Sequence, residues 1–353
     1  MKKLVLLFVF VAALTTLVAC SQKPKLYVLN WGDYMDTDLI AAFEEEYGVQ
    51  VSYKPAGSNE EMATLLQASN TPYDIVIPSD YMIDKLIQED LLQEIQFDLL
   101  TNYESLNVID KLETLYQDST IAPYLVPYAW GTIGIMYNTT NPDLKTFVET
   151  NQWGALFQSG SYRAGMYDSA RDAVASALLY LGYHVNSDDT TELAAAENAL
   201  KNAGFTAWGE DNLKGLVISG NLDLALVYSG DYFSEYYVAL EDEIDITFDF
   251  YVPDVTNVWL DAMVIPKNSQ NVELAHQFID FFLRPDIAIQ NSDYIGYAPC
   301  YQQVYDLMIS EEYGYDFDTF DPYPAGAVRQ MYVYGSDDRQ NRIVQILSRA
   351  KSE

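Results

Sequence analysis

The chain has 353 residues, of which 52 are acidic and only 19 are basic, so its formal net charge at pH 7 is −33. Such an acidic chain repels polyanions, which argues against nucleic acid or an anionic membrane surface as its partner and favours the attraction of cations. Acidity also keeps a secreted protein soluble, so the charge alone decides little. The length suffices for two ordinary domains.

The N-terminus has the pattern of a bacterial lipoprotein signal. Two lysines precede an apolar run over 4–13, and small residues lead into Cys20. The apolar run is too short to span a bilayer comfortably. We therefore predict a signal peptide over 1–19, a diacylglyceryl thioether on Cys20 and a short polar tether over 20–25. The alternative is an ordinary secretory signal followed by a chance cysteine.

Cysteine and histidine are too scarce to suggest redox or metal chemistry. If Cys20 carries lipid, Cys300 stands alone and no intrachain disulfide can form. The two histidines, His184 and His276, are too few for most zinc sites. We place His276 at the surface or boundary of a helix. The acidic segment over 316–321 lacks EF-hand spacing and is expected to be a surface loop. No metal and no cofactor are predicted.

The first part of the mature chain alternates between strands and helices. The expected elements are a strand over 26–29, a helix over 38–47, a strand over 49–53, a helix opened by a capping box at Ser58, a strand over 73–78 and a helix over 82–88. This alternation predicts crossover units and a largely parallel sheet in an α/β fold. In such sheets ligands bind outside the carboxyl ends of the strands.

Aromatic rings and carboxylates recur directly after the expected strands. The segments that carry them are 31–34, 79–81, 168–172 and 229–232, together with Trp259 and Asp261. Trp259 and Asp261 are two residues apart, so an extended backbone would place both side chains on one face. A tyrosine at the edge of a core would explain any one of these segments, but five together favour a shared site.

Rings and carboxylates with almost no nearby arginine or lysine suit an organic cation. An aromatic face attracts an ammonium group by roughly 0.5–2 kcal/mol and also packs against methylene groups. A buried ammonium group further requires a carboxylate partner, because its desolvation would otherwise prevent binding. An acid at each end of an aromatic slot would fit an aliphatic diamine or triamine.

Seven stretches, taken in order, resemble the spermidine/putrescine-binding proteins of bacterial polyamine ABC transporters. They are LYVLNWGDYM, YDIVIPSDYMIDKL, PYAWGTIGIMYN, DSARDA, WLDAMVIPKN, FIDFFLRPDIA and IGYAP. The resemblance covers essentially the whole mature chain. It implies a two-lobed, periplasmic-binding-protein-like α/β fold of type II, with the ligand in the interlobe cleft. Lobe 1 would comprise 26–131 plus 262–305, and lobe 2 would comprise 132–261 plus 306–353.

The resemblance also implies which residues bind the ligand. They are Trp31, Asp33, Tyr34, Ser79, Tyr81, Ser169, Asp172, Tyr228, Trp259, Asp261 and Gln340. Ser169 stands where the family has an acid, and Tyr228 stands where it has a tryptophan. Asp168, one residue earlier, is a candidate replacement for the missing acid. These departures leave open the choice between spermidine and putrescine.

The expected protein is therefore a monomeric, extracytoplasmic lipoprotein and not an enzyme. The resemblance implies that it captures a polyamine and passes it to a permease driven by an ATPase, and that it contacts the membrane only through its lipid. Two alternatives remain. The adjacent Tyr236 and Tyr237 resemble those of ferric-ion binders, and paired carboxylates serve glycosidases and similar hydrolases. Against an enzyme, no nucleophile motif or phosphate loop is present.

Overall fold

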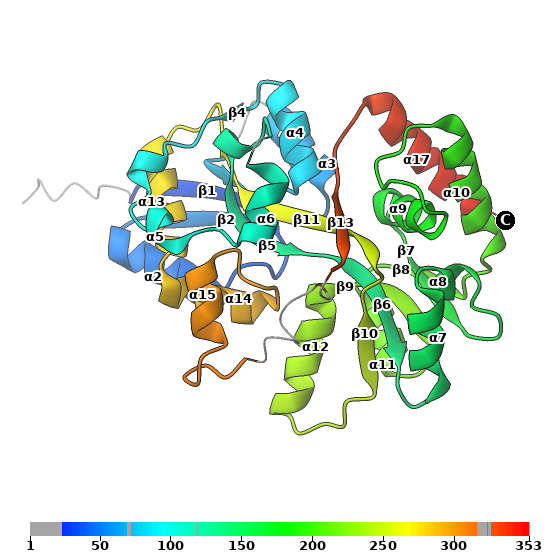
Figure 1. Ribbon diagram of the computed structural model, residues 1–353. Coiled ribbons are helices and arrows are strands. Elements are labelled where there is room, and N and C mark those ends of the chain that lie inside the picture. The colour runs from blue at the N-terminus through cyan, green and yellow to red at the C-terminus, as the bar shows by residue number, and fades with distance from the viewer. Residues whose placement is uncertain (1–22, 69–71, 118, 316–322, 324–325, 353) are drawn as a thin grey trace, which may run out of the picture.

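The computed structural model describes residues 23–68, 72–117, 119–315, 323 and 326–352. The predicted signal peptide, Cys20 and the acidic segment over 316–321 lie outside these residues. Two lobes stand side by side and are joined by strands that run between them (Figure 1). We call the half built on the sheet of the first three strands lobe 1, and the half built on the five-stranded sheet lobe 2.

Lobe 1 opens with the predicted alternation of strands and helices. Its first elements are β1 (Lys25–Trp31), α2 (Thr37–Tyr47), β2 (Gln50–Ala56), α3 (Asn59–Gln67), β3 (Ile75–Val76) and α4 (Asp80–Gln88). The strands are parallel in the order β2-β1-β3. Helix α2 ends where Gly48 adopts a left-handed φ of 67°, and the Ser58 side chain caps α3 by accepting the N–H of Glu61. These helix boundaries confirm the sequence prediction.

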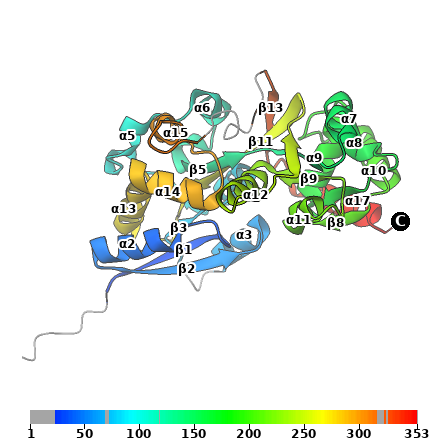
Figure 2. The same ribbon diagram turned by 90° about the horizontal axis from the view of Figure 1, so that it is seen from below.

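The rest of lobe 1 comes from two separate parts of the chain. The elements are β4 (Leu92–Gln93), η2 (Phe97–Leu99), α5 (Tyr103–Leu106), α6 (Asp110–Tyr116), η3 (Ala122–Tyr124), β12 (Ile265–Pro266), α13 (Val272–Phe282), α14 (Pro285–Ile295) and α15 (Gln302–Met308). The ring centroid of Phe43 in α2 lies 5.0 Å from that of Phe278 and 5.5 Å from that of Phe281 in α13. The returning chain therefore completes the core of lobe 1 (Figure 2).

His276 and Cys300 are among the polar or reactive side chains buried in lobe 1. His276 is only 1 % exposed, so its predicted place at a helix surface or boundary is wrong. Its Nδ1 lies 2.7 Å from the Val272 carbonyl oxygen and its Nε2 accepts the N–H of Gln96, so both ring nitrogens are satisfied in the core. Cys300 is also buried, and burial raises the pKa of its thiol.

Lobe 2 contains a mixed five-stranded sheet. Its elements are β6 (Ile133–Asn138), α7 (Asp143–Asn151), α8 (Gly154–Phe157), β7 (Ala164–Tyr167), α9 (Ala170–Tyr180), α10 (Thr190–Asn202), β8 (Ala207–Gly209), α11 (Asn212–Ile218), β9 (Leu224–Tyr228), α12 (Ser229–Glu241), β10 (Phe248–Tyr251) and α17 (Asp337–Ala350). The strand order is β10-β6-β9-β7-β8, and β6 is antiparallel to both of its neighbours. The largely parallel sheet predicted from the elements over 26–88 is confirmed in lobe 1. The sheet of lobe 2 is mixed, because β6 enters directly from a strand that runs between the lobes.

Three strands form the connection between the lobes. They are β5 (Val126–Gly131), β11 (Val255–Met263) and β13 (Val328–Met331). Strand β11 lies between the other two, antiparallel to β5 and parallel to β13. The extended backbone predicted around Trp259 and Asp261 is confirmed, since both residues belong to β11. The boundaries given above for the two lobes stay a prediction.

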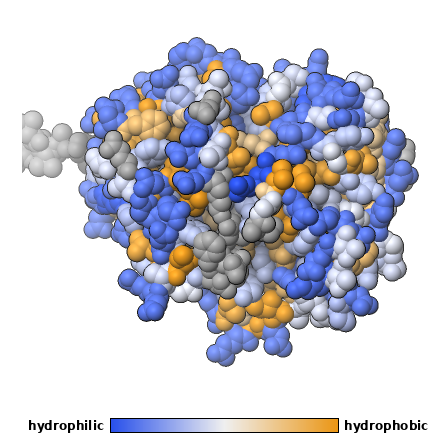
Figure 3. Space-filling view, in the orientation of Figure 1, coloured by the Kyte–Doolittle hydropathy of each residue, from blue (hydrophilic) through white to orange (hydrophobic). Residues whose placement is uncertain are grey.

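The visible face is hydrophilic over much of both lobes, with apolar side chains gathered at the end of α12 (Figure 3). Val238 and Leu240 in this helix have 49 % and 50 % of their surface exposed. Within the part of the chain that the structure describes, no helix combines the length and apolarity needed to cross a membrane.

Candidate functional site

Asp261 lies at the centre of the predicted site, on the strand that connects the lobes. Its side chain is buried, and its Oδ2 accepts a hydrogen bond from the Tyr34 hydroxyl at 3.1 Å. Its Oδ1 has no hydrogen-bond partner among the described residues. Burial raises the pKa of Asp261 to about 6, against the opposing effects of the Ser79 and Tyr34 hydroxyls and of the charge on Arg171. This carboxylate therefore has one oxygen free to accept a hydrogen bond from a cationic donor.

Four rings beside Asp261 form what we call the aromatic cluster: Tyr34, Tyr228, Trp259 and Tyr297. The Trp259 ring centroid lies 6.0 Å from that of Tyr228 and 5.0 Å from that of Tyr297, with both rings edge-on to it. Tyr297 in turn lies 5.8 Å from Tyr34. The cluster therefore connects rings from both lobes through a chain of edge-on contacts.

Glycine is required where the cluster meets the backbone. A Cβ atom on Gly230, in the first turn of α12, would come within 2.2 Å of the Tyr297 ring. A Cβ atom on Gly131, at the end of β5, would come within 2.7 Å of the Trp259 ring. Both rings therefore lie directly on backbone that has no side chain, which fixes their positions.

Asp172 lies in the first turn of α9 and is already paired within the protein. Its Oδ2 accepts the Tyr228 hydroxyl at 2.7 Å, and its Oδ1 lies 3.2 Å from the Arg171 Nε and 3.4 Å from the Tyr332 hydroxyl. Ser169 is the N-cap of α9, and its hydroxyl accepts the Asp172 N–H at 3.4 Å. Ser169 thus positions Asp172 through the helix start.

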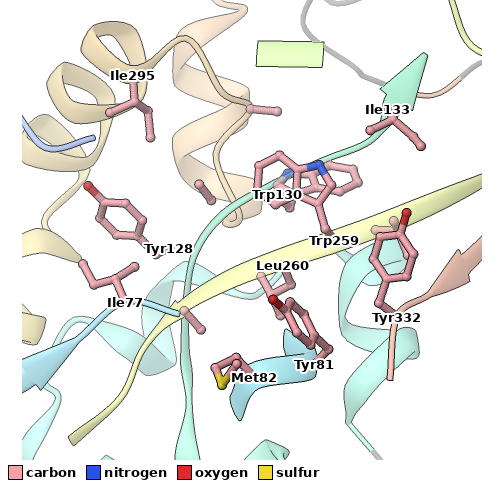
Figure 4. Close-up of a cluster of buried hydrophobic side chains, with 14 of the residues drawn as sticks. Ile77, Tyr81, Met82, Tyr128, Trp130, Ile133, Trp259, Leu260, Ile295 and Tyr332 are labelled. Atoms are coloured by element: carbon pink, nitrogen blue, oxygen red, sulfur yellow. The ribbon is translucent and has the colours of Figure 1, made fainter. Parts of the chain in front are cut away.

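Arg171 corrects the expectation that the site has almost no nearby cation. Its guanidinium carbon lies 4.9 Å from the ring centroid of Tyr81 and 5.0 Å from that of Tyr332. Figure 4 shows the Tyr81 and Tyr332 rings beside β11, near Trp259. The sequence did not suggest that Arg171 and Asp172 share one site, because consecutive helix residues usually point in different directions. The two acids therefore differ: Asp172 has a cation partner, whereas Asp261 Oδ1 has none among the described residues.

Ser79 and Tyr81 lie at the start of α4, against β11. Ser79 forms an isolated backbone bridge with Asp261, and its hydroxyl accepts the Asn59 side-chain amide at 3.0 Å. The Tyr81 hydroxyl donates to Glu60 Oε1 at 3.1 Å. Through these bonds α3 and α4 hold one wall of the site in place.

Three predicted ligand residues make their own contacts at the edges of this arrangement. Trp31 is partly buried, and its carbonyl accepts the Tyr53 hydroxyl at 2.7 Å. Asp33 is exposed on a backbone with a positive φ of 44°. Gln340 is partly buried in α17 and donates to the Tyr334 carbonyl at 2.6 Å. Their roles as ligand residues stay predictions.

Asp168, the candidate replacement for the acid missing at Ser169, has a partner elsewhere. Its carboxylate forms an ion pair with Lys351, which follows α17 at the C-terminal end of the chain. The separation of 183 residues between the two partners made this pair invisible to sequence inspection. A carboxylate that is already paired is a weaker candidate for a ligand cation.

Two further residues belong to the site but are absent from the predicted ligand set. Tyr297 completes the aromatic cluster, and its place in the matching stretch IGYAP was the signal that could have found it. Asp80 is buried beside Asp261, where it accepts the N–H groups of Tyr81 at 2.6 Å and of Leu260 at 3.2 Å. Burial raises the pKa of Asp80 to about 8, and the negative charge of Asp261 adds to this effect. Asp80 fixes β11 against α4.

Comparison with known proteins agrees with this geometry. The family model for bacterial extracellular solute-binding proteins matches residues 38–316. The chain belongs to this family. The match reaches into both lobes and includes the connecting strands β5 and β11, with Trp259 and Asp261, whereas β1, β13 and α17 lie outside it.

Individual relatives of this solute-binding protein are similar over most of their length. The spermidine/putrescine-binding periplasmic protein of Escherichia coli K12 is 32% identical over 278 residues, which are 77% of this chain and 76% of the relative. The putrescine-binding periplasmic protein of Pseudomonas aeruginosa is 31% identical over 286 residues, or 77% of each chain. A solved structure, the putative spermidine/putrescine ABC transporter from Listeria monocytogenes, matches with a TM-score of 0.79 and 31% identity, over 93% of this chain and 98% of that one. The predicted two-lobed α/β fold is confirmed.

Proposed function

We propose that this protein is the extracytoplasmic substrate-binding component of an ABC importer and that it captures a polyamine, spermidine or putrescine. The observation that carries the proposal is the buried Asp261 carboxylate, with one unpartnered oxygen beside the aromatic cluster. An ammonium group of the ligand would donate to Asp261 Oδ1, and the rings would cover the neighbouring methylene groups. The names of the relatives at 31–32% identity support the same ligand class.

The proposal also assigns ligand contacts to the other predicted ligand residues, and it includes the membrane subunits of the importer as partners. The permease and the ATPase of the importer would receive the polyamine, and the protein itself would act as a monomer without catalytic activity. The polyamine-binding relatives favour this function over ferric-ion binding or hydrolysis. For ferric ion, the pair Tyr236 and Tyr237 would have to supply phenolate ligands. Addition of ferric salt would then produce a purple-red charge-transfer band.

Titration calorimetry tests the ligand class directly. We expect saturable binding of putrescine or spermidine, because each carries terminal ammonium groups joined by methylene chains. The panel is putrescine, cadaverine, spermidine, spermine, choline and the basic amino acids. Choline lacks an N–H donor for Asp261, and a basic amino acid brings a carboxylate into an acidic site, so both should bind more weakly. Tighter binding of choline or arginine than of every polyamine would reject the proposal.

Membrane attachment through Cys20 is a separate part of the proposal. Cys20→Ser removes the thiol that would carry the lipid, so the protein should be released into the surrounding medium or remain unprocessed. Detergent partitioning of cell fractions measures the change, and Cys300→Ser is the matched control that should partition as the parent does. Membrane association that persists unchanged in Cys20→Ser would contradict the lipid anchor.

A further inference from the structure

Arg171 makes a contact that joins the two lobes. It is carried by α9 in lobe 2, whereas Tyr81, whose ring lies 4.9 Å from its guanidinium carbon, is carried by α4 in lobe 1. Tyr332, which follows β13, covers the guanidinium at 5.0 Å. A guanidinium between aromatic faces is held by cation–π attraction and by stacking of its planar group. The contact exists only while the two lobes meet at this point.

Both partners in the contact are fixed from behind. The Tyr81 side chain is 6 % exposed, and its hydroxyl is bonded to Glu60 in α3. On the other side, Arg171 Nη2 donates to the Tyr228 hydroxyl at 2.9 Å and Arg171 pairs with Asp172. Burial lowers the pKa of Arg171, but the charge of Asp172 and the surrounding tyrosines raise it by more than burial lowers it. The net effect is a pKa well above the ordinary value, so the group stays charged. The contact therefore joins two rigid surfaces rather than two flexible side chains.

A second contact crosses the same junction one turn further along α4. The Lys85 ammonium nitrogen lies 5.1 Å from the ring centroid of Tyr334, which lies between β13 and α17. Two contacts between a cation and an aromatic ring therefore cross the junction along α4, Arg171 with Tyr81 and Lys85 with Tyr334. This repetition marks the α4 surface as the place where lobe 1 closes against the segments of lobe 2.

We propose that Arg171 is a positioning residue that stabilises closure of the lobes and holds Asp172 and Tyr228 in place at the site. The inference rests on the proposed function of this site in polyamine binding. Arg171 cannot be a direct partner of the ligand ammonium groups, because both carry positive charge. Its effect on binding must therefore pass through the geometry of the closed site.

Such a role has a quantitative signature. The apparent dissociation constant of a ligand equals its intrinsic value divided by the fraction of protein in the binding-competent arrangement. Loss of the contact lowers that fraction for every ligand alike. The affinity should therefore fall by one common factor for putrescine and spermidine, whereas loss of a direct ligand contact would affect the two ligands differently.

The experiment is a double-mutant cycle across the junction. The variants are Arg171→Gln, Tyr81→Leu and the double variant, with calorimetry on putrescine and spermidine and with small-angle scattering of the ligand-free proteins. We expect Arg171→Gln to lower the affinity for both ligands by the same factor, about 3- to 30-fold for a contact of this type. Tyr81→Leu should cost less affinity in the Arg171→Gln background than in the parent. The ligand-free radius of gyration should rise in both single variants.

The control is Arg163→Gln, which removes an arginine paired with Asp223 on the surface of lobe 2, at 2.8 Å. It should change neither affinity nor radius of gyration. Thermal melts check folding, and Arg171→Lys, which keeps the charge but loses the planar group, should give an intermediate loss. If Arg171→Gln does not fold, the comparison of Tyr81→Leu in the parent and in Arg171→Lys takes its place.

Two results would overturn the role of Arg171. One is additivity of the two substitutions in binding, and the other is an unchanged radius of gyration in ligand-free Arg171→Gln or, if that variant does not fold, in Tyr81→Leu. A gain in spermidine affinity alone would also overturn it, since that would mean Arg171 competes with the ligand for Asp172. If the parent binds no polyamine, the proposed function fails, and the scattering comparison still decides whether Arg171 holds the lobes together.

Discussion

Asp261→Asn is expected to weaken polyamine binding by about two to three orders of magnitude. The substitution keeps the shape of the side chain but leaves the ligand ammonium buried against a neutral amide. Breaking one partner of a buried ion pair costs about 3–5 kcal/mol, and each tenfold change in affinity corresponds to about 1.4 kcal/mol. Asp261 Oδ1 has no partner among the described residues, so this oxygen is available to the ligand ammonium.

Calorimetry at near-physiological salt measures this loss, with thermal melts to confirm folding. Asp98→Asn is the matched control, since Asp98 is exposed in lobe 1 and contributes only to the long-range field. Salt screens that field beyond about 8–10 Å, so the control should bind nearly as the parent does. An Asp261→Asn protein that folds and binds polyamine within threefold of the parent would refute this carboxylate as the anchor.

Polyamine affinity is also expected to fall as the pH drops below about 6. The pKa of Asp261 is raised to about 6 by burial, so its carboxylate is charged above that pH and neutral below it. The bound ammonium favours the charged form and lowers this pKa in the complex, so binding requires loss of the proton. Affinity should therefore fall about tenfold between pH 7 and pH 5.

Calorimetry between pH 4.5 and 7.5 at constant ionic strength gives the slope. Asp80, with a pKa of about 8, would change the charge near Asp261 mainly above this interval and in the sense that strengthens binding at higher pH. The charge of Arg171 does not change over the same range, because its pKa lies above the ordinary value for arginine. Asp261→Asn should abolish most of this change of affinity with pH. A parent affinity that stays constant from pH 7 to 5 would show that the pKa of Asp261 lies outside this range.

Local patterns in the sequence were enough for the parts of the fold that depend on neighbours along the chain. The capping residue Ser58 and the helix end at Gly48 follow from backbone geometry that a few residues determine. Trp259 and Asp261 could be placed on one face because side chains in a strand alternate with a period of two. The direction of β6 could not be predicted in this way, since it depends on which lobe the chain enters and from where.

The features of the site that could not be predicted from the sequence depend on contacts between distant segments. Tyr297 meets Trp259 only because the C-terminal end of α14 packs against Gly230 in α12. The stacking of Arg171 on Tyr81 requires the two lobes to be placed relative to each other, which no local pattern encodes. Sequence therefore indicated which kinds of side chain form the site, but not which of its charges are already neutralised within the protein.

The buried thiol of Cys300 has a practical consequence for measuring motion in lobe 1. Alkylating reagents react with the thiolate, and burial both blocks their access and raises the pKa of this group. With Cys20 covered by lipid or replaced, Cys300 is the only remaining cysteine of the chain. Its rate of labelling by a maleimide then reports how often the region around it opens to solvent, and it does so without any introduced probe.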